Sequence, residues 1–189
     1  MKTKDDINKG SRHQKIIGQF GEQIVCNWLS RCGFEVAIVD HTGLDIIAYQ
    51  PKAKARFGIT VKSRTRQAGT ESESVNLFSL RHKDRHKLVA ACKAFGCQPW
   101  IAVYVETSNE ADIFLTSLAH YDEKFRSKTR KQMEDWKMSR SYLDRYAQDH
   151  SVKHLHFTFD KNAWKWGERA VGDCCSKIRR KVRVNAEPK

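Results

Sequence analysis

A chain of 189 residues with 35 lysines and arginines against 22 aspartates and glutamates has a formal net charge of +13. That length can bury the core of one domain, and so large an excess of positive charge attracts polyanions, either nucleic acid or an anionic membrane surface. No apolar stretch approaches the length of a membrane span, and the polar N-terminus lacks the apolar region of a secretory signal. We therefore expect a cytoplasmic protein that binds nucleic acid and not a membrane.

The pattern of polar and apolar residues predicts one domain with polar ends. Residues 1–11 are polar, and we expect them to be disordered. The core is expected over residues 12–116 and an extension of the same domain, with a helix and a strand, over residues 117–160. Residues 161–189, with nine lysines and arginines against three acids, are expected to form a basic C-terminal tail.

The first predicted element is a helix over residues 12–31. Four apolar residues at helical spacing are expected to face the core: Ile17, Phe20, Ile24 and Trp28. Gly18 and Gly21 each cost about 1 kcal/mol of helix propensity relative to alanine, which indicates that another backbone approaches closely. Glu22 lies on an adjoining row of the helix, at the flank of the buried face.

Three strands are expected to follow as an antiparallel meander, at residues 34–40, 44–49 and 57–64. Asp45 stands at the start of the second strand, and Lys62 stands late in the third. Alternate residues of a strand share a face, so Lys62 lies on the same face as Thr60, and the acid and the lysine are expected to converge. A carboxylate that can hold a divalent cation, beside a fixed positive charge, suits an enzyme that acts on phosphodiesters.

A polar loop over residues 67–76, a helix over 79–95 and a strand over 100–106 are expected to complete the core. The basic first turns of this helix oppose the helix dipole, which is a sign of a phosphate-binding role. A solvated surface is nevertheless the preferred interpretation of these charges. The apolar run of the strand is typical of a central strand covered on both sides. The expected fold class is α/β, with a mixed central sheet flanked by helices.

Beyond the core, we expect a strand at residues 113–116, a charged helix at 128–149 and a strand at 152–159. On the last strand, His154 and His156 are interpreted as outward-facing residues and not as metal ligands, because no pattern of acids or cysteines accompanies them.

The six cysteines are too few for a disulfide scaffold, and we expect them to be reduced. The spacing of His82, His86, Cys92 and Cys97 matches no zinc finger or ribbon. Cys92 also falls on the apolar stripe of its helix, so no zinc site is expected there.

Parts of residues 15–106 resemble the PD-(D/E)XK, or restriction-endonuclease-like, nuclease superfamily. The members that this chain resembles are archaeal Holliday-junction resolvases and small bacterial endonuclease-like proteins. Three blocks carry the resemblance: Gly18-Gln19-Phe20-Gly21-Glu22, Gly43-Leu44-Asp45-Ile46-Ile47-Ala48 and Thr60-Val61-Lys62-Ser63-Arg64. The resemblance implies an αβββαβ core with a C-terminal α/β extension. The family has an acid two residues before the lysine, where this chain has Thr60.

The resemblance further implies a metal-dependent endonuclease that hydrolyses duplex or branched DNA, and it is compatible with a homodimer. Asp45 would bind Mg²⁺ or Mn²⁺ together with Glu22 and the backbone carbonyl of Val61. Lys62 would help to polarise the attacking water and stabilise charge on the phosphate. The residues expected to contact the nucleic acid are Arg56, Ser63, Arg64, Arg66, Arg81, Lys83, Arg179 and Arg180.

Two alternatives remain open at this point. Thr60 stands where the family has an acid, and this removes one negative charge from the metal site. In the first alternative, the chain is therefore a DNA-binding module of the same fold with impaired catalysis. In the other alternative, an unrelated basic RNA-binding protein, the placement of Asp45 and Lys62 is accidental and the positive charge is the main functional feature.

Overall fold

The computed structural model describes residues 7, 9–66, 74–127 and 133–160. Nearly all of these residues belong to one compact unit, Met1–Thr158, and a second unit, Phe159–Lys189, lies outside the described residues except for its first two. The ends expected at residues 1–11 and 161–189 therefore fall largely outside the described part of the chain.

The helices of the described chain are α1 (His13–Arg31), α2 (Asp84–Phe95), α3 (Leu118–Lys124) and α4 (Arg140–Gln148). Its strands are β1 (Glu35–His41), β2 (Leu44–Gln50), β3 (Ala55–Thr65), β4 (Ser74–Ser79), β5 (Gln98–Glu106), β6 (Glu110–Ser117), β7 (Met133–Lys137) and β8 (Lys153–Thr158). None of these helices is long and apolar enough to cross a membrane.

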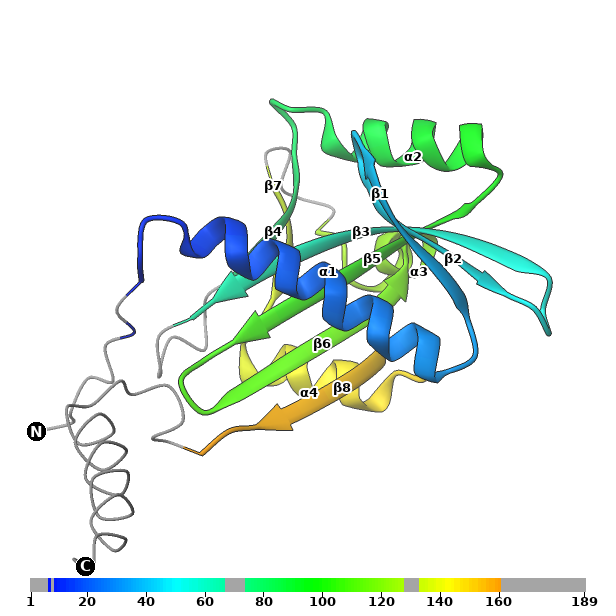
Figure 1. The fold of residues 1–189 in the computed structure, drawn as a ribbon. Coiled ribbons are helices and arrows are strands. Elements are labelled where there is room, and N and C mark those ends of the chain that lie inside the picture. The colour runs from blue at the N-terminus through cyan, green and yellow to red at the C-terminus, as the bar shows by residue number, and fades with distance from the viewer. Residues whose placement is uncertain (1–6, 8, 67–73, 128–132, 161–189) are drawn as a thin grey trace, which may run out of the picture. The chain divides into compact units, whose positions relative to one another are not determined.

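Six strands form one mixed sheet in the order β1-β2-β3-β5-β6-β8 (Figure 1). β3 and β5 are parallel neighbours connected through α2, and the other neighbouring strands are antiparallel. The order α1-β1-β2-β3-α2-β5 confirms the expected αβββαβ core, with β4 inserted before α2. β6 and β8 extend the sheet beyond these elements, although residues 110–116 of β6 fall within the range expected for the core.

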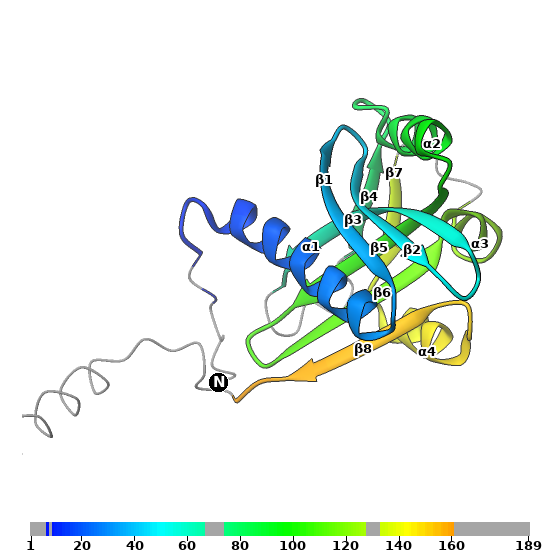
Figure 2. The same ribbon diagram turned by 45° about the vertical axis from the view of Figure 1, so that its right-hand side comes forward.

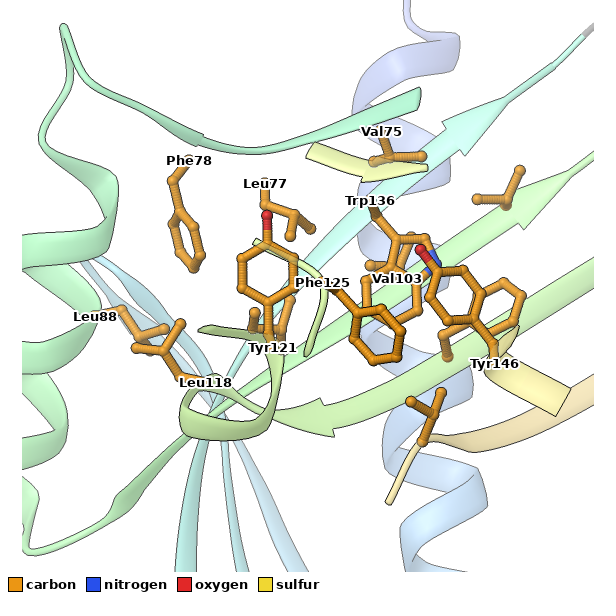
Figure 3. Close-up of a cluster of buried hydrophobic side chains, with 14 of the residues drawn as sticks. Val75, Leu77, Phe78, Leu88, Val103, Leu118, Tyr121, Phe125, Trp136 and Tyr146 are labelled. Carbon is orange, nitrogen blue, oxygen red and sulfur yellow. The ribbon is translucent and has the colours of Figure 1, made fainter. Parts of the chain in front are cut away.

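The central strand β5 is buried on both faces, as its apolar run predicted. Ile101, Val103 and Val105 point into an aromatic cluster on one face, whereas Tyr104 points to α1 on the other. Figure 2 shows α1 lying across one face of the sheet. The aromatic cluster, shown in part in Figure 3, joins the sheet to β7, α3 and α4 through these buried rings: Phe114, Tyr121, Phe125, Trp136 and Tyr146.

Two expectations for the intervening segments are wrong. β4 takes the place of the end of the loop expected over 67–76, and the helix expected over 79–95 begins later, at Asp84, as α2. The helix expected at 128–149 is replaced by β7 followed by α4. β4 and β7 pair with each other in a separate two-stranded sheet, with Val75 opposite Trp136. Because each strand depends on a partner about sixty residues away, local periodicity does not reveal either of them.

One arginine links α2 to α3 and β7. Arg85 donates to both oxygens of Glu134 at 2.7–3.0 Å and forms a two-pronged pair with Asp122. Glu134 is buried, so its charge depends on this guanidinium and on Arg126, which lies 3.3 Å from it. The pairing ties the short β4–β7 sheet to the rest of the unit.

The buried face of α1 differs from the expected stripe. Its buried residues are Ile17, Gly21, Val25, Cys26 and Leu29, and Phe20 is 47% exposed. The helix turns this face to the sheet because Gly21 lies directly on β3: a Cβ at this position would be 2.1 Å from Ser63 Oγ and 3.4 Å from the Cβ of Tyr104. The close approach expected of Gly21 is confirmed, whereas nothing lies within 4 Å of a Cβ built on Gly18.

Candidate active site

Asp45 is held between the turn that begins β2 and the neighbouring strand β3. Its Oδ2 accepts hydrogen bonds from the backbone N–H of Val61 at 2.6 Å and from the hydroxyl of Thr60 at 3.0 Å. Gly43, two residues earlier, has φ +92°, and a Cβ there would lie 2.7 Å from the backbone of Lys87 on α2. Glycine is therefore required for this turn, and the turn and the two hydrogen bonds together define the position of the carboxylate.

The backbone of Val61 offers a second oxygen on the same side. In an extended strand, the N–H and C=O of one residue point to the same neighbouring strand. Because the Val61 N–H points to Asp45, its carbonyl is directed to the Asp45 side of β3 as well. A carboxylate and a carbonyl are oxygen ligands of the kind that Mg²⁺ and Mn²⁺ prefer.

Glu22 on α1 adds negative charge to this region. Burial raises the pKa of Glu22, and the carboxylates of Asp45 and Asp40 raise it further. Asp40 was not among the residues expected at the site. It could have been found from the sequence, because a two-residue turn at Thr42 and Gly43 places residue 40 across the hairpin from residue 45. The structure therefore couples three acids from α1, β1 and β2.

Lys62 follows Thr60 by two residues on β3, so the two side chains lie on one face, about 6.6 Å apart along the strand. The parallel register places Lys62 beside Val103 and Ser63 beside Tyr104. Within the described part of the chain, the half-buried Lys62 forms no hydrogen bond or ion pair. Its ammonium is therefore available for an incoming anion.

The three acids do not form a compact ligand cluster. Within the described ranges, a group of three histidine, cysteine or acidic ligand atoms within 4.8 Å of one another is found elsewhere, on β6 and β8. A cation near Asp45 would thus contact few side chains directly. That suits Mg²⁺, which keeps several of its waters and binds through one or two carboxylates.

The residues expected to contact nucleic acid fall into three groups. Arg56, Arg64, Arg81 and Lys83 are exposed, although Arg56 stands six residues before Lys62, about 20 Å along β3. Two others are less accessible: the Ser63 hydroxyl is buried beneath α1, and Arg66 is only 7% exposed. Arg179 and Arg180 lie outside the described residues.

Comparison with protein-family models and with curated protein sequences gave no match. Among solved structures, a Holliday junction resolvase of Archaeoglobus fulgidus is 19% identical, with 67% of this chain and 87% of the resolvase covered and a TM-score of 0.46. A bacterial homing endonuclease is 12% identical, with 92% of this chain and 94% of the endonuclease covered and a TM-score of 0.40. At these identities and TM-scores, neither structure assigns a residue role or an activity to this chain.

Proposed function

We propose that this chain is a metal-dependent endonuclease that hydrolyses phosphodiester bonds in DNA. The observation that carries the proposal is the placement of Asp45. Its carboxylate accepts hydrogen bonds from Thr60 and Val61 on β3, and its charge raises the pKa of Glu22 on α1. Lys62 follows on the same strand and lacks a partner within the described chain. Acidic oxygens and an ammonium that act on one phosphate would form the combination that phosphodiester hydrolysis requires.

The acids of this site fit a divalent cation. The raised pKa of Glu22 reflects a partly buried position with two neighbouring carboxylates, and such a concentration of negative charge is relieved by a cation. We assign Asp45, Glu22 and the Val61 carbonyl as the groups that would hold Mg²⁺ or Mn²⁺. The bound ion would supply a Lewis acid for the phosphate and lower the pKa of a coordinated water.

The side chains then have separate roles. The two hydrogen bonds to Oδ2 orient the Asp45 carboxylate, and the Lys62 ammonium binds an anionic oxygen of the scissile phosphate and stabilises the charge that develops there. Thr60 is a hydrogen-bond donor to Asp45 and supplies no charge, so Glu22 has to provide the second carboxylate.

The net charge of +13 supports a polyanionic substrate, with Arg64, Arg81 and Lys83 as exposed phosphate contacts and the basic tail at residues 161–189 as a further one. We expect the enzyme to act in the cytoplasm on duplex or branched DNA, and a homodimer is compatible with this role. The logarithm of the DNA affinity should fall linearly with the logarithm of salt concentration, by about 0.9 per neutralised phosphate on duplex DNA. A flat salt response would contradict phosphate-based binding.

The test is a cleavage assay on linear, branched and single-stranded DNA with Mg²⁺ or Mn²⁺. Asp45→Asn and Lys62→Met should each lower the cleavage rate by about 100-fold or more while the fold is retained. Asp144→Asn on α4 and Lys93→Ala on α2 are matched exposed controls and should cleave at the wild-type rate. Cleavage that survives Asp45→Asn would contradict the assignment of this site.

Thr60 favours the second candidate function, a DNA-binding module of the same fold without activity. Its neutral hydroxyl occupies the position where the resemblance places an acid, and it donates a hydrogen bond to Asp45. DNA binding that is unchanged in Asp45→Asn, with no cleavage at any metal concentration, would select this candidate. A marked preference for RNA in the same binding assay would instead select the basic RNA-binding protein.

A further inference from the structure

The neighbouring strands β6 and β8 bring together an acid and two histidines far from each other in the sequence. Asp112 Oδ1 lies 2.8 Å from Nε2 of His154 and 2.8 Å from Nδ1 of His156. The expectation that no acid accompanies these histidines is therefore wrong. The acid comes from a strand more than forty residues earlier, which a search for nearby patterns does not reach.

The strand register explains why different ring nitrogens face the same oxygen. His156 stands directly opposite Asp112, so its near nitrogen, Nδ1, reaches the carboxylate. His154 stands opposite Phe114, on the diagonal from Asp112, where the separation between side chains is greater and only the far nitrogen, Nε2, reaches. The three donor atoms thus converge because of the backbone pairing itself.

Packing holds one ring in the orientation that a ligand needs. The imidazole of His154 stacks on Phe114, with ring centroids 4.6 Å apart and an angle of 8° between the planes. Phe114 is 1% exposed and belongs to the aromatic cluster, so its ring is fixed. Asp112 is largely buried, with 17% of its side chain exposed, whereas the histidines are 34% and 44% exposed. The group of Asp112 and the two histidines is therefore packed against the aromatic cluster on one side and exposed to solvent on the opposite side.

We propose that Asp112, His154 and His156 form a binding site for a divalent transition-metal ion, with Zn²⁺ as the ion best matched to two imidazoles and one carboxylate. Tetrahedral ligands about 2.1 Å from a Zn²⁺ ion are about 3.4 Å apart. The contacts of 2.8 Å from Asp112 to each nitrogen are shorter than that, so the side chains would move apart by about half an ångström to admit the ion. On binding, the two nitrogens would offer their lone pairs to the ion in place of the hydrogen bonds to Oδ1.

The ligand set distinguishes this site from the one proposed at Asp45. Imidazole nitrogens favour Zn²⁺ and related ions over Mg²⁺, whereas carboxylate and carbonyl oxygens favour Mg²⁺ and Mn²⁺. Three protein ligands leave one or more positions for water or an anionic oxygen such as that of a phosphate. The ion would also join β8, at the edge of the sheet, to β6. The inference does not depend on the proposed nuclease activity.

The test measures Zn²⁺ binding by calorimetry on the full chain after treatment with a chelator, with Mg²⁺ present in excess. Asp112→Asn keeps the size of the side chain but loses its charge, and it should weaken Zn²⁺ binding at this site by more than about tenfold. His154→Ala with His156→Ala should abolish it. His82→Ala with His86→Ala removes two exposed histidines elsewhere and is the matched control, which should bind as the wild type does.

Two further measurements separate the outcomes. Zn²⁺ should raise the melting temperature of the wild type and of Asp45→Asn but not of Asp112→Asn, because the ion links two strands of the folded state only. Co²⁺ in the same site should give weak visible bands without the strong near-ultraviolet band of a thiolate ligand. Equal Zn²⁺ affinity in the wild type and in Asp112→Asn, or a loss of affinity in the His82 and His86 control of the same size, would overturn the proposal.

Discussion

The two glycines of α1 should respond in opposite directions to replacement by alanine. Alanine is favoured over glycine by about 1 kcal/mol in a helix interior. At Gly18 nothing lies within 4 Å of the new Cβ, so Gly18→Ala should stabilise the protein by about that amount. At Gly21 the new Cβ would lie 2.1 Å from Ser63 Oγ and 3.3 Å from the Cβ of Ser63.

Overpacking of this kind costs about 1–3 kcal/mol, which offsets or exceeds the gain in helix propensity at Gly21. Gly21→Ala should therefore leave the protein between unchanged and about 2 kcal/mol less stable. Ser63→Ala removes the atom that clashes, and the Ser63 hydroxyl is buried with no hydrogen-bond partner among the described residues. The double variant should recover most of the gain seen in Gly18→Ala.

The assay is urea unfolding followed by circular dichroism. The wild type, Gly21→Ala, Ser63→Ala and the double variant form a double-mutant cycle, and Gly18→Ala is measured beside them. A Gly21→Ala variant as stable as Gly18→Ala would refute the close approach of α1 to β3. The same shift of the helix would move Glu22, so weaker Mg²⁺ or Mn²⁺ binding in Gly21→Ala, and not in Gly18→Ala, is expected as well.

Three further predictions concern charged residues of the described chain. Burial and two neighbouring acids raise the pKa of Glu22, so Asp40→Asn should lower that pKa, as followed by NMR titration; an unchanged value would show that Asp40 is not coupled to it. Arg85→Ala leaves the buried carboxylate of Glu134 without its main cation and should lower the free energy of unfolding by about 3–5 kcal/mol. Replacement of the exposed Arg140, which begins α4, is the control and should lower it by less than about 1 kcal/mol. Burial raises the pKa of Asp149, but hydrogen bonds from His120 and a backbone N–H lower it below its usual value, so this carboxylate stabilises the fold above about pH 4 and less as the pH falls through its folded pKa. Asp149→Asn should therefore lose less stability than the wild type in urea unfolding below pH 4, and an identical pH dependence would contradict this assignment.

The core of the fold could be predicted from the sequence because its elements are continuous and strongly patterned. α1, the β1–β3 meander, α2 and β5 each carry their own periodicity, and the turns within the meander and between α2 and β5 are short enough to limit the topology. The same local signals placed Asp45 at the start of β2 and Lys62 on β3. Once the limits of a strand are predicted, the place of each of these residues along that strand follows directly from its number in the sequence.

The contacts between distant segments were decided by the tertiary structure alone. β4 and β7 are strands only because they pair with each other, and Asp112 meets His154 only through the pairing of β6 with β8. The buried face of α1 is set by how closely Gly21 lies on β3, not by where the largest apolar side chains stand. That packing also buries the Ser63 hydroxyl, so that a residue expected to contact DNA lies beneath a helix. Each of these outcomes depends on which backbone lies next to a residue in space, a property that side-chain patterns along one segment do not encode.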